Sequence, residues 1–463
     1  MATQSPSRAA RKRPMTGPQT RMAAGKALRE EMPRKIHATW KVPAHRADPI
    51  DVLRAGDAHR VVELLPIKYG RMLQSPFTFY RGSAAIMAAD LAPTPSTGIR
   101  VQACGDCHLM NFGGFATPER RILFDINDLD ETLPAPWEWD VKRLVTSFVL
   151  ASRSNGLSER YAREAAVAVA RSYREHMRKF ADLDVLEIWY SSLGADAVLA
   201  ELPVEEQAFA RKQGGKARKQ SSHEVLFTKL IDDQAPQPRI RDRPPLIFHP
   251  QVRRRGEYEE LISKVYASYR QTLQDDRRIL LDRYKLVDAA IKVVGIGSVG
   301  TVCMVLLLMS MAEVPLFLQL KEAGPSVLEP FAGASELRHH GERVVQGQRL
   351  MQPASDIFLG WCTGPSGRQF YMRQLRDVKI PPVVETFDAE IMAIYGSICG
   401  WALARAHARS AEPWTITGYL GAKDVFDEAM GDFAVAYADQ AEKDHARLKA
   451  AVRAGTIDAR PEE

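Results

Sequence analysis

The stretch KVVGIGSVGTVCMVLLLM at residues 292–309, followed by LFLQLKEA at 316–323, decides the fold that we expect for this chain. Two apolar runs lie on either side of a glycine-rich motif, and the second run is rich in β-branched residues. Short apolar runs of this kind, bounded by glycine, are typical of buried strands. We therefore expect a β-rich unit over residues 286–380, in which a glycine loop joins two strands.

Two classes of nucleotide-binding site contain the motif Gly295-x-Gly297-x-x-Gly300. In a dinucleotide site a helix begins inside the motif, whereas in kinases strands flank the loop and its backbone N–H groups cover the nucleotide phosphates. The strand expected after Gly300 favours the second class, with Ser298 included in the phosphate-binding loop. Lys321 ends the next strand, where it can reach the α- and β-phosphates. The alternatives are a plain tight hairpin and an exposed lysine at a strand end.

The stretch VQACGDCHLMNFGGFATPERRILFDINDLDE (101–131) carries the candidate catalytic residues. The residues of interest in it are Asp106, Asn111, Asp125, Asp128 and Asp130. Phosphoryl transfer needs a carboxylate that orients the attacking hydroxyl and oxygen ligands for Mg²⁺. We expect Asp106 to take the first role, and Asn111 with Asp128 the second, with Asp125 as the next choice of metal ligand. The alternative is a solvated acidic turn.

The cysteines and histidines suggest no separate chemistry. Five cysteines in the chain do not make a disulfide framework, which suits a reducing cytoplasm. Cys104 and Cys107 have the spacing of redox dithiols and zinc ligands, but no second pair completes a zinc site. We expect His108 and His407 to be structural or to orient loops.

The composition locates the charge and excludes some classes of protein. The chain has 463 residues, of which 45% are hydrophobic and 26% charged, and these ordinary globular values exclude wholesale disorder. Of the net charge of +6, residues 1–35 supply nine bases and two acids, so the other 428 residues carry −1. These 428 residues show no excess of basic side chains of the kind that binds nucleic acid, so we expect no nucleic-acid partner. The longest apolar run, Val302–Met311, has about half of the roughly 20 residues needed to cross a bilayer, so we expect no membrane partner.

The organisation expected along the chain has five parts. These are a disordered basic tail without a signal sequence (1–40), a catalytic-loop and metal-binding segment (41–150), a helical segment with a basic loop near 211–245 (151–285), a β-rich nucleotide-binding lobe (286–380), and a helical segment (381–463) that completes a helical lobe.

Seven motifs in order carry a resemblance to a family. They are SPFTFYRG, CGDCHLMNFG, FDINDLDET, PWEWDVKRL, VGIGSVGT, LQLKEA and GQRLMQPASDIFLGW. Together they resemble an uncharacterised bacterial family, domain of unknown function 2252, from about residue 45 to near the C-terminus. Membership by itself implies little chemistry.

A looser resemblance links the chain to the aminoglycoside-phosphotransferase and protein-kinase superfamily. Those enzymes carry a motif HGDxHxxN and then a strand ending in I-D-F-D, which CGDCHLMN and INDLD resemble. The resemblance implies Asp106 as the catalytic aspartate and Asn111 and Asp128 as metal ligands. Asp140 matches an aspartate that helps to fix the helical lobe. Cys104 stands where the superfamily usually has histidine.

The order of the motifs differs from that of kinases, because here the glycine loop follows the catalytic loop. The resemblance therefore implies an α+β, two-lobed, protein-kinase-like fold that is circularly permuted, with 286–410 read before 101–150. It predicts that Lys321 and Asp128 lie across one site. It also implies a glutamate beside Lys321, for which Glu342 is the candidate and Glu336 the alternative.

The expected function is that of an ATP- and Mg²⁺-dependent phosphotransferase that acts on a hydroxyl of an unidentified small-molecule or protein acceptor. Adenylyl transfer uses the same parts. A non-catalytic nucleotide-binding module of the same fold is the first alternative. An NAD(P)-binding oxidoreductase is the second, and it requires a helix rather than a strand after Gly300.

Overall fold

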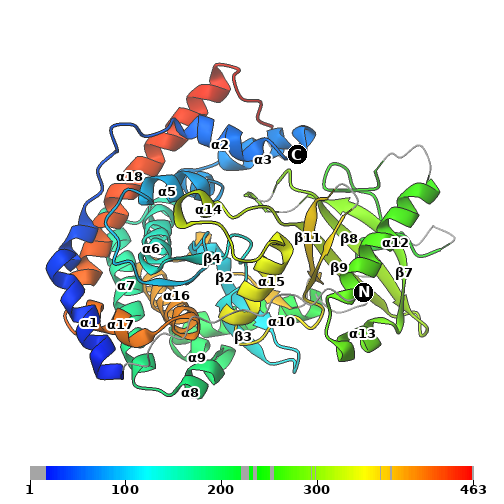
Figure 1. The fold of residues 1–463 in the computed structure, drawn as a ribbon. Helices are drawn as coiled ribbons and strands as arrows, with labels where there is room; N and C mark the ends of the chain where they lie inside the picture. Colours follow the sequence, from blue (N-terminus) through cyan, green and yellow to red (C-terminus); the bar gives the residue numbers. More distant parts are fainter. Residues whose placement is uncertain are drawn as a thin grey trace.

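The structure is a computed structural model that describes most of the chain. The described residues are 17–220, 229–232, 237–250, 255–293, 295–297, 299–364, 367–375 and 378–460. Ser298, and residues 1–16 of the expected tail, lie outside them. The fold is of the α+β class, as expected, with a helical body beside an antiparallel sheet (Figure 1). No helix among the described residues has both the length and the apolarity to cross a membrane.

A six-stranded antiparallel sheet forms the β-rich unit. Its order is β10 (Gly360–Thr363), β11 (Gln369–Gln374), β9 (Pro315–Glu322), β8 (Cys303–Ser310), β7 (Tyr284–Lys292) and β6 (Ile247–Phe248). The strand expected after Gly300 is confirmed, because β8 begins at Cys303 and pairs with β7 and β9. Apolar clusters cover both faces of the sheet, and this explains the continuous apolar run of β8.

Further helices lie against the large sheet or against the small sheets next to it. They are α9 (Ala195–Ala200), α10 (Val204–Gln220), α12 (Arg255–Gln271), α13 (Asp275–Leu281), α14 (Glu329–Ala332) and α15 (His340–Met351). The interpretation of 211–245 as a loop is wrong for 211–220, which belong to α10.

Long helices with alanine-rich contact faces build the helical body. They are α6 (Trp137–Ser154), α7 (Glu159–Ala181), α16 (Ala389–Ser410), α17 (Pro413–Leu420) and α18 (Val425–Arg453). Shorter elements cover the body: α2 (Pro49–Asp57), η2 (Val62–Leu64), α3 (Leu65–Met72), α4 (Pro76–Arg81), α5 (Ala84–Leu91), α8 (Val185–Tyr190) and η4 (Val384–Thr386). Buried residues of α6, α7, α16 and α18 share one core. The helices expected within 151–285 and 381–463 are thus present.

Two small antiparallel sheets carry the acidic stretch between the helical body and the large sheet. In the first, β1 (Arg100–Ala103) pairs with β4 (Leu133–Pro136). The second has the order β12 (Lys379–Ile380), β2 (Phe112–Ala116), β3 (Ile122–Ile126) and β5 (Leu193–Gly194). A short turn, η3 (Leu109–Asn111), precedes β2. The acidic stretch therefore lies where the β-rich unit and the helices meet (Figure 1).

The expectation of disorder does not hold for residues 17–40. Residues 18–31 form α1 (Pro18–Glu31), and η1 (Arg34–Ala38) follows. Arg29 donates to the carbonyls of Gly418 and Tyr419, and Arg34 donates to that of Leu420. These carbonyls end α17, where cationic side chains stabilise a helix. The basic side chains that suggest a solvated tail therefore cap a helix nearly four hundred residues away.

Candidate functional site

Lys321 meets the acidic loop between β3 and β4. Its Nζ lies 2.5 Å from Asp130 Oδ2 and 3.9 Å from Asp128 Oδ1. Tyr371, on the neighbouring strand β11, donates its hydroxyl to Asp130 Oδ1 at 2.5 Å. The expected proximity of Lys321 and Asp128 is confirmed, although they lie about 190 residues apart in the sequence. We call Asp106, Asn111, Asp128, Asp130 and Lys321 the acidic junction.

The two aspartates beside Lys321 differ in their electrostatics. Burial and the charge of Asp130 raise the pKa of Asp128. Burial acts in the same direction on Asp130, but Lys321 and Arg373 outweigh it and hold the pKa of Asp130 well below its usual range. Asp130 is therefore the counter-ion of Lys321. Asp128 keeps a buried Oδ1 without a hydrogen-bond partner among the described residues, which suits a bound cation.

The loop that carries Asp106 is fixed through its backbone. The carboxylate of Asp140 accepts hydrogen bonds from the N–H groups of Cys104 and Gly105 at 2.6 and 3.0 Å. His407 lies 3.1 Å from the same carboxylate and is fully buried, which fits the expected structural role. Asp140, in the first turn of α6, thus ties the loop that carries Asp106 to the helical body.

The side chain of Asp106 is partly exposed and oriented by an arginine. Arg143, one turn after Asp140 on α6, donates to Asp106 Oδ1 through Nε at 2.7 Å and Nη2 at 2.5 Å. Asn111 donates its side-chain amide to the carbonyl of Asp106 at 2.7 Å, and Asn127 N donates to the carbonyl of Asn111 at 2.8 Å. The loop that carries Asp106 and the acidic loop are therefore joined directly.

Gly105 brings the two loops into contact. It has φ +84, and a Cβ at this position would collide with the backbone carbonyl of Glu131. Glycine is required here for both the left-handed conformation and the close approach. The carbonyl of Glu131 accepts from Ser326 Oγ at 2.6 Å, which links the acidic loop to the segment after β9.

The glycine loop lies against the segment that precedes α4. Arg60 donates to the carbonyls of Gly297 and Val299 at 2.6 and 2.5 Å, and Arg71 donates to that of Gly295. A Cβ on Gly297 would lie 3.5 Å from the carbonyl of Arg81, and the Arg81 guanidinium interacts electrostatically with Asp106. Gly297 of the glycine loop thus lies beside the end of α4, whose Arg81 interacts with the charge of Asp106.

The prediction that a glutamate pairs with Lys321 is wrong. The ion pairs of Lys321 are made with Asp128 and Asp130, while Glu342 lies in the first turn of α15 and Glu336 is exposed. The helix α15 instead sends Arg343 to the carbonyls of Asp130 at 2.9 Å and Thr132 at 2.6 Å. A basic side chain that holds backbone oxygens replaces the expected acidic one.

Asp125 is not placed to bind a metal. It is fully buried on β3, where its Oδ2 accepts from Arg405 of α16 at 2.5 Å and its Oδ1 from Ile126 N at 2.7 Å. Burial raises the pKa of Asp125 to about 6 although Arg405 opposes the shift. Both oxygens are used in the core, so Asp125 is removed from the candidate metal ligands.

The remaining donors do not complete a metal site by themselves. Among the described residues, no group of three or more His, Cys, Asp or Glu side chains is arranged to hold a metal ion. Cys104 and Cys107 are buried free thiols. Mg²⁺ usually takes one or two carboxylates together with substrate phosphates and water, a requirement that Asp128 with Asn111 can meet.

The structure adds functional candidates that the sequence did not identify. They are Arg81, Asp130 as the lysine partner, Arg143, Tyr371 and Arg373. The sequence could have indicated Arg143, because it lies three residues after Asp140 and therefore on the same face of a helix.

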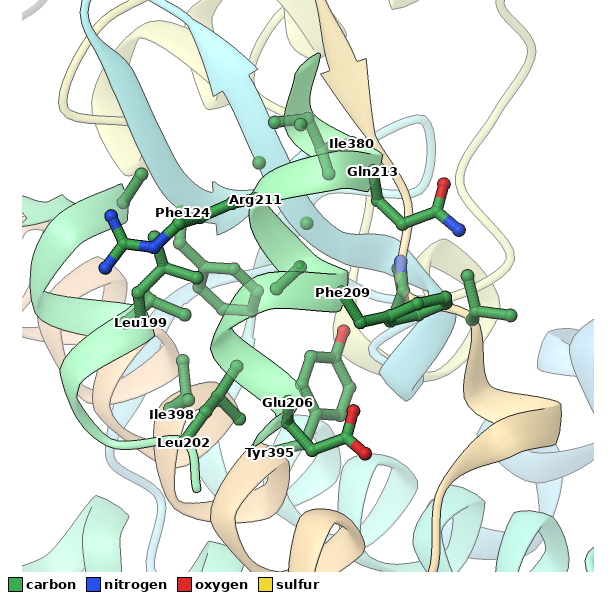
Figure 2. Close-up of a pocket in the computed structure, with 18 of the residues that line it drawn as sticks. Phe124, Leu199, Leu202, Glu206, Phe209, Arg211, Gln213, Ile380, Tyr395 and Ile398 are labelled. Carbon is green, nitrogen blue, oxygen red and sulfur yellow. The ribbon is translucent and has the colours of Figure 1, made fainter. Parts of the chain in front are cut away.

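A cavity of about 400 Å³ lies behind the β2–β3 hairpin, between α10 and α16 (Figure 2). Phe124, Leu199 and Ile398 contribute to its apolar wall, and Glu206 lies near Tyr395 at one end. The Tyr395 hydroxyl donates to the carbonyls of Leu109 at 2.9 Å and Phe112 at 3.3 Å, on either side of Asn111. The cavity therefore adjoins the segment Leu109–Phe112, which follows Asp106.

Comparison with known proteins identifies the family of the chain. Residues 60–451 match the model of the family described as "Uncharacterized protein conserved in bacteria (DUF2252)". No curated protein and no solved structure matches the chain.

Proposed function

We propose, for a chain that belongs to the bacterial family DUF2252, that the acidic junction binds ATP with Mg²⁺ and transfers a phosphoryl group to a hydroxyl acceptor. The observation that carries the proposal is the contact of Lys321 with Asp128 and Asp130. A lysine at the end of the interior strand β9, beside carboxylates and paired with the strand that follows the glycine loop, brings together the groups that hold a triphosphate and its metal.

One contact supports a kinase-like arrangement in permuted order. Gln102 N, on the strand that leads to Asp106, donates to Ser410 Oγ at 3.1 Å. Ser410 ends α16, so a path through 286–410 continues in space into 101–150. In kinases the corresponding helix leads directly into the catalytic loop, and this contact is what a permuted connection requires.

The reaction that we propose is a direct displacement. The acceptor oxygen bonds to the γ-phosphorus, the bond to the β–γ bridging oxygen breaks, ADP leaves, and Asp106 receives the hydroxyl proton. Mg²⁺, held by Asp128 and Asn111, would neutralise charge on the phosphate oxygens. Lys321 is held towards the phosphates by Asp130. Most of the rate enhancement then comes from placement and charge neutralisation.

The experiment measures the thermal stability of the full chain with Mg²⁺–ATP, with NAD and without ligand. We expect only Mg²⁺–ATP to raise Tm, since a ligand at a hundredfold excess over Kd stabilises by about 2.7 kcal/mol. Asp128→Asn should remove the shift, whereas Asp276→Asn, on exposed α13, should retain it. Stabilisation by NAD alone would refute the proposal.

A second candidate is nucleotide binding without transfer. The observation that favours it is the double hydrogen bond from Arg143 to Asp106 Oδ1, which occupies one oxygen of the carboxylate that would have to receive the hydroxyl proton. Transfer from [γ-³²P]ATP to a panel of small-molecule and protein acceptors separates the two. Binding that survives Asp106→Asn, with no labelled product from the unmodified chain, would support the module.

A further inference from the structure

A second cavity, of about 230 Å³, opens beside the acidic junction on the far side of Asn127. Its walls come from the end of the β2–β3 hairpin, from α15, and from β11 and β12. Its lining does not include Asp106, Asn111, Asp128 or Lys321. The inference below therefore goes beyond the proposed function and does not rest on it.

The polar groups of this cavity are mostly donors. Arg120 and Arg373 contribute two guanidinium cations, Lys379 contributes an amine whose pKa is lowered to about 7 by desolvation and by Arg373, and Asn127, Gln348 and Gln352 contribute amides. Asp356 is the carboxylate in the lining, and its oxygens accept from Phe358 N at 2.7 Å and Gln374 N at 2.5 Å. The cavity thus carries an excess of positive charge, which favours an anionic occupant.

One of these donors is buried and has no partner. Gln348 is 4% exposed, and its Nε2 makes no hydrogen bond within the described part of the chain. By contrast, Gln352 Nε2 donates to the carbonyl of Ile126 at 2.8 Å. An unpaired buried donor is costly, so its retention in a cavity points to a ligand oxygen that satisfies it.

The contacts of the two inner cations are long. Arg373 Nη1 and Lys379 Nζ each lie 3.5 Å from the carbonyl of Asn127, and Arg373 Nε lies 3.4 Å from Gln319 Oε1. These distances are at the outer limit of hydrogen bonding, so both cations retain capacity for a better acceptor. The nearby carboxylate of Asp130 is already engaged by Lys321.

We propose that this cavity is a phosphate-binding site. A guanidinium, an ammonium and an amide that converge on one space match the oxygens of a phosphate group, which a guanidinium binds in bidentate fashion. The volume of about 230 Å³ exceeds the roughly 30 Å³ of a water molecule several-fold, so a phosphate with part of its carrier fits. The ligand is either free phosphate or the phosphoryl group of a larger molecule.

The test is titration calorimetry of the full chain with inorganic phosphate, against chloride at equal ionic strength. Gln348→Leu removes the unpaired donor without leaving a new one, so its Tm should be unchanged or higher, while phosphate binding weakens about tenfold. Gln348→Glu should abolish binding through charge repulsion. Arg373→Met should also weaken it, and Arg277→Met, on exposed α13, should not.

The variants also identify the location and the source of the phosphate. Asp106→Asn should retain phosphate binding, which separates this site from the proposed transfer reaction. ADP without Mg²⁺ is titrated in the same way. If ADP binds more tightly than phosphate, and Gln348→Glu loses this binding too, the ligand is the phosphoryl group of a larger molecule. If ADP binds equally or more weakly, the ligand is the free anion. Absence of phosphate binding, or binding that is unchanged in Gln348→Glu, would overturn the inference.

Discussion

Replacing each aspartate beside Lys321 by asparagine should separate stability from ligand binding. In Asp130→Asn, the 4% exposed side chain of Lys321 loses the oxygen 2.5 Å away and keeps only Asp128 at 3.9 Å. Removing one partner of a buried ion pair costs about 3–5 kcal/mol. The Asp130 side chain is 25% exposed, and Asp128 remains as a second counter-ion. We therefore expect Asp130→Asn to lower the free energy of unfolding by about 2 kcal/mol.

Asp128→Asn should have the opposite effect on the ligand-free protein. Because the pKa of Asp128 is raised in the folded state, its ionised form carries a cost at neutral pH that asparagine removes. We therefore expect a Tm equal to or above that of the unmodified chain. The same variant should lose the stabilisation by Mg²⁺–ATP.

The assay is thermal denaturation of the full chain and the two variants between pH 3 and pH 8. The pKa of Asp130 is lowered in the folded state, so its contribution is complete above the unfolded value of about 3.9 and is lost as the pH falls towards the folded value. The Tm difference between the unmodified chain and Asp130→Asn should accordingly shrink below about pH 4. Equal Tm losses in both variants at pH 7 would refute the assignment of Asp130 as the counter-ion.

Three further predictions concern the support of the site. Deleting residues 1–38 should lower Tm by several degrees, since the caps on α17 and the packing of α1 are lost; an unchanged Tm would show that this segment contributes nothing. Gly105→Ala should cost more stability than Gly156→Ala, because both have positive φ but only Gly105 meets a backbone carbonyl; equal losses of Tm would contradict this. Asp125→Asn should destabilise by about 3–5 kcal/mol, as it leaves fully buried Arg405 unpaired, and a small change in denaturation midpoint would count against that pairing.

The sequence predicted the parts of the fold that depend on local pattern. The apolar run after Gly300 indicated a strand, which β8 occupies, and β9 occupies the run after it, whereas β7 ends at Lys292, just before the glycines. The motif resemblance predicted that Lys321 and Asp128 lie close together, which no local pattern shows. The first success follows from the composition of short segments, whereas the second follows from the resemblance of the motifs to a known superfamily.

The failures come from partners distant in sequence. Residues 18–31 have the composition of a solvated tail, but the carbonyls that their arginines cap belong to α17. Asp125 ends a strand as a metal ligand does, but the alternation of β3 directs it to Arg405 in the core. The partner of Lys321 was predicted on the helix that follows its strand, whereas the structure shows Asp130 of the acidic loop in this place. Charge pairing in three dimensions decided each case.

The crystal structure of the full chain with a non-hydrolysable ATP analogue and Mg²⁺ tests the central claim most directly. The claim is that two distant parts of the chain form one nucleotide site. We predict the triphosphate between Lys321 and Asp128, with the metal on Asp128 and Asn111 and the glycine loop over the phosphates. A nucleotide bound elsewhere, with the Lys321–Asp130 pair left as it is without ligand, would contradict the account.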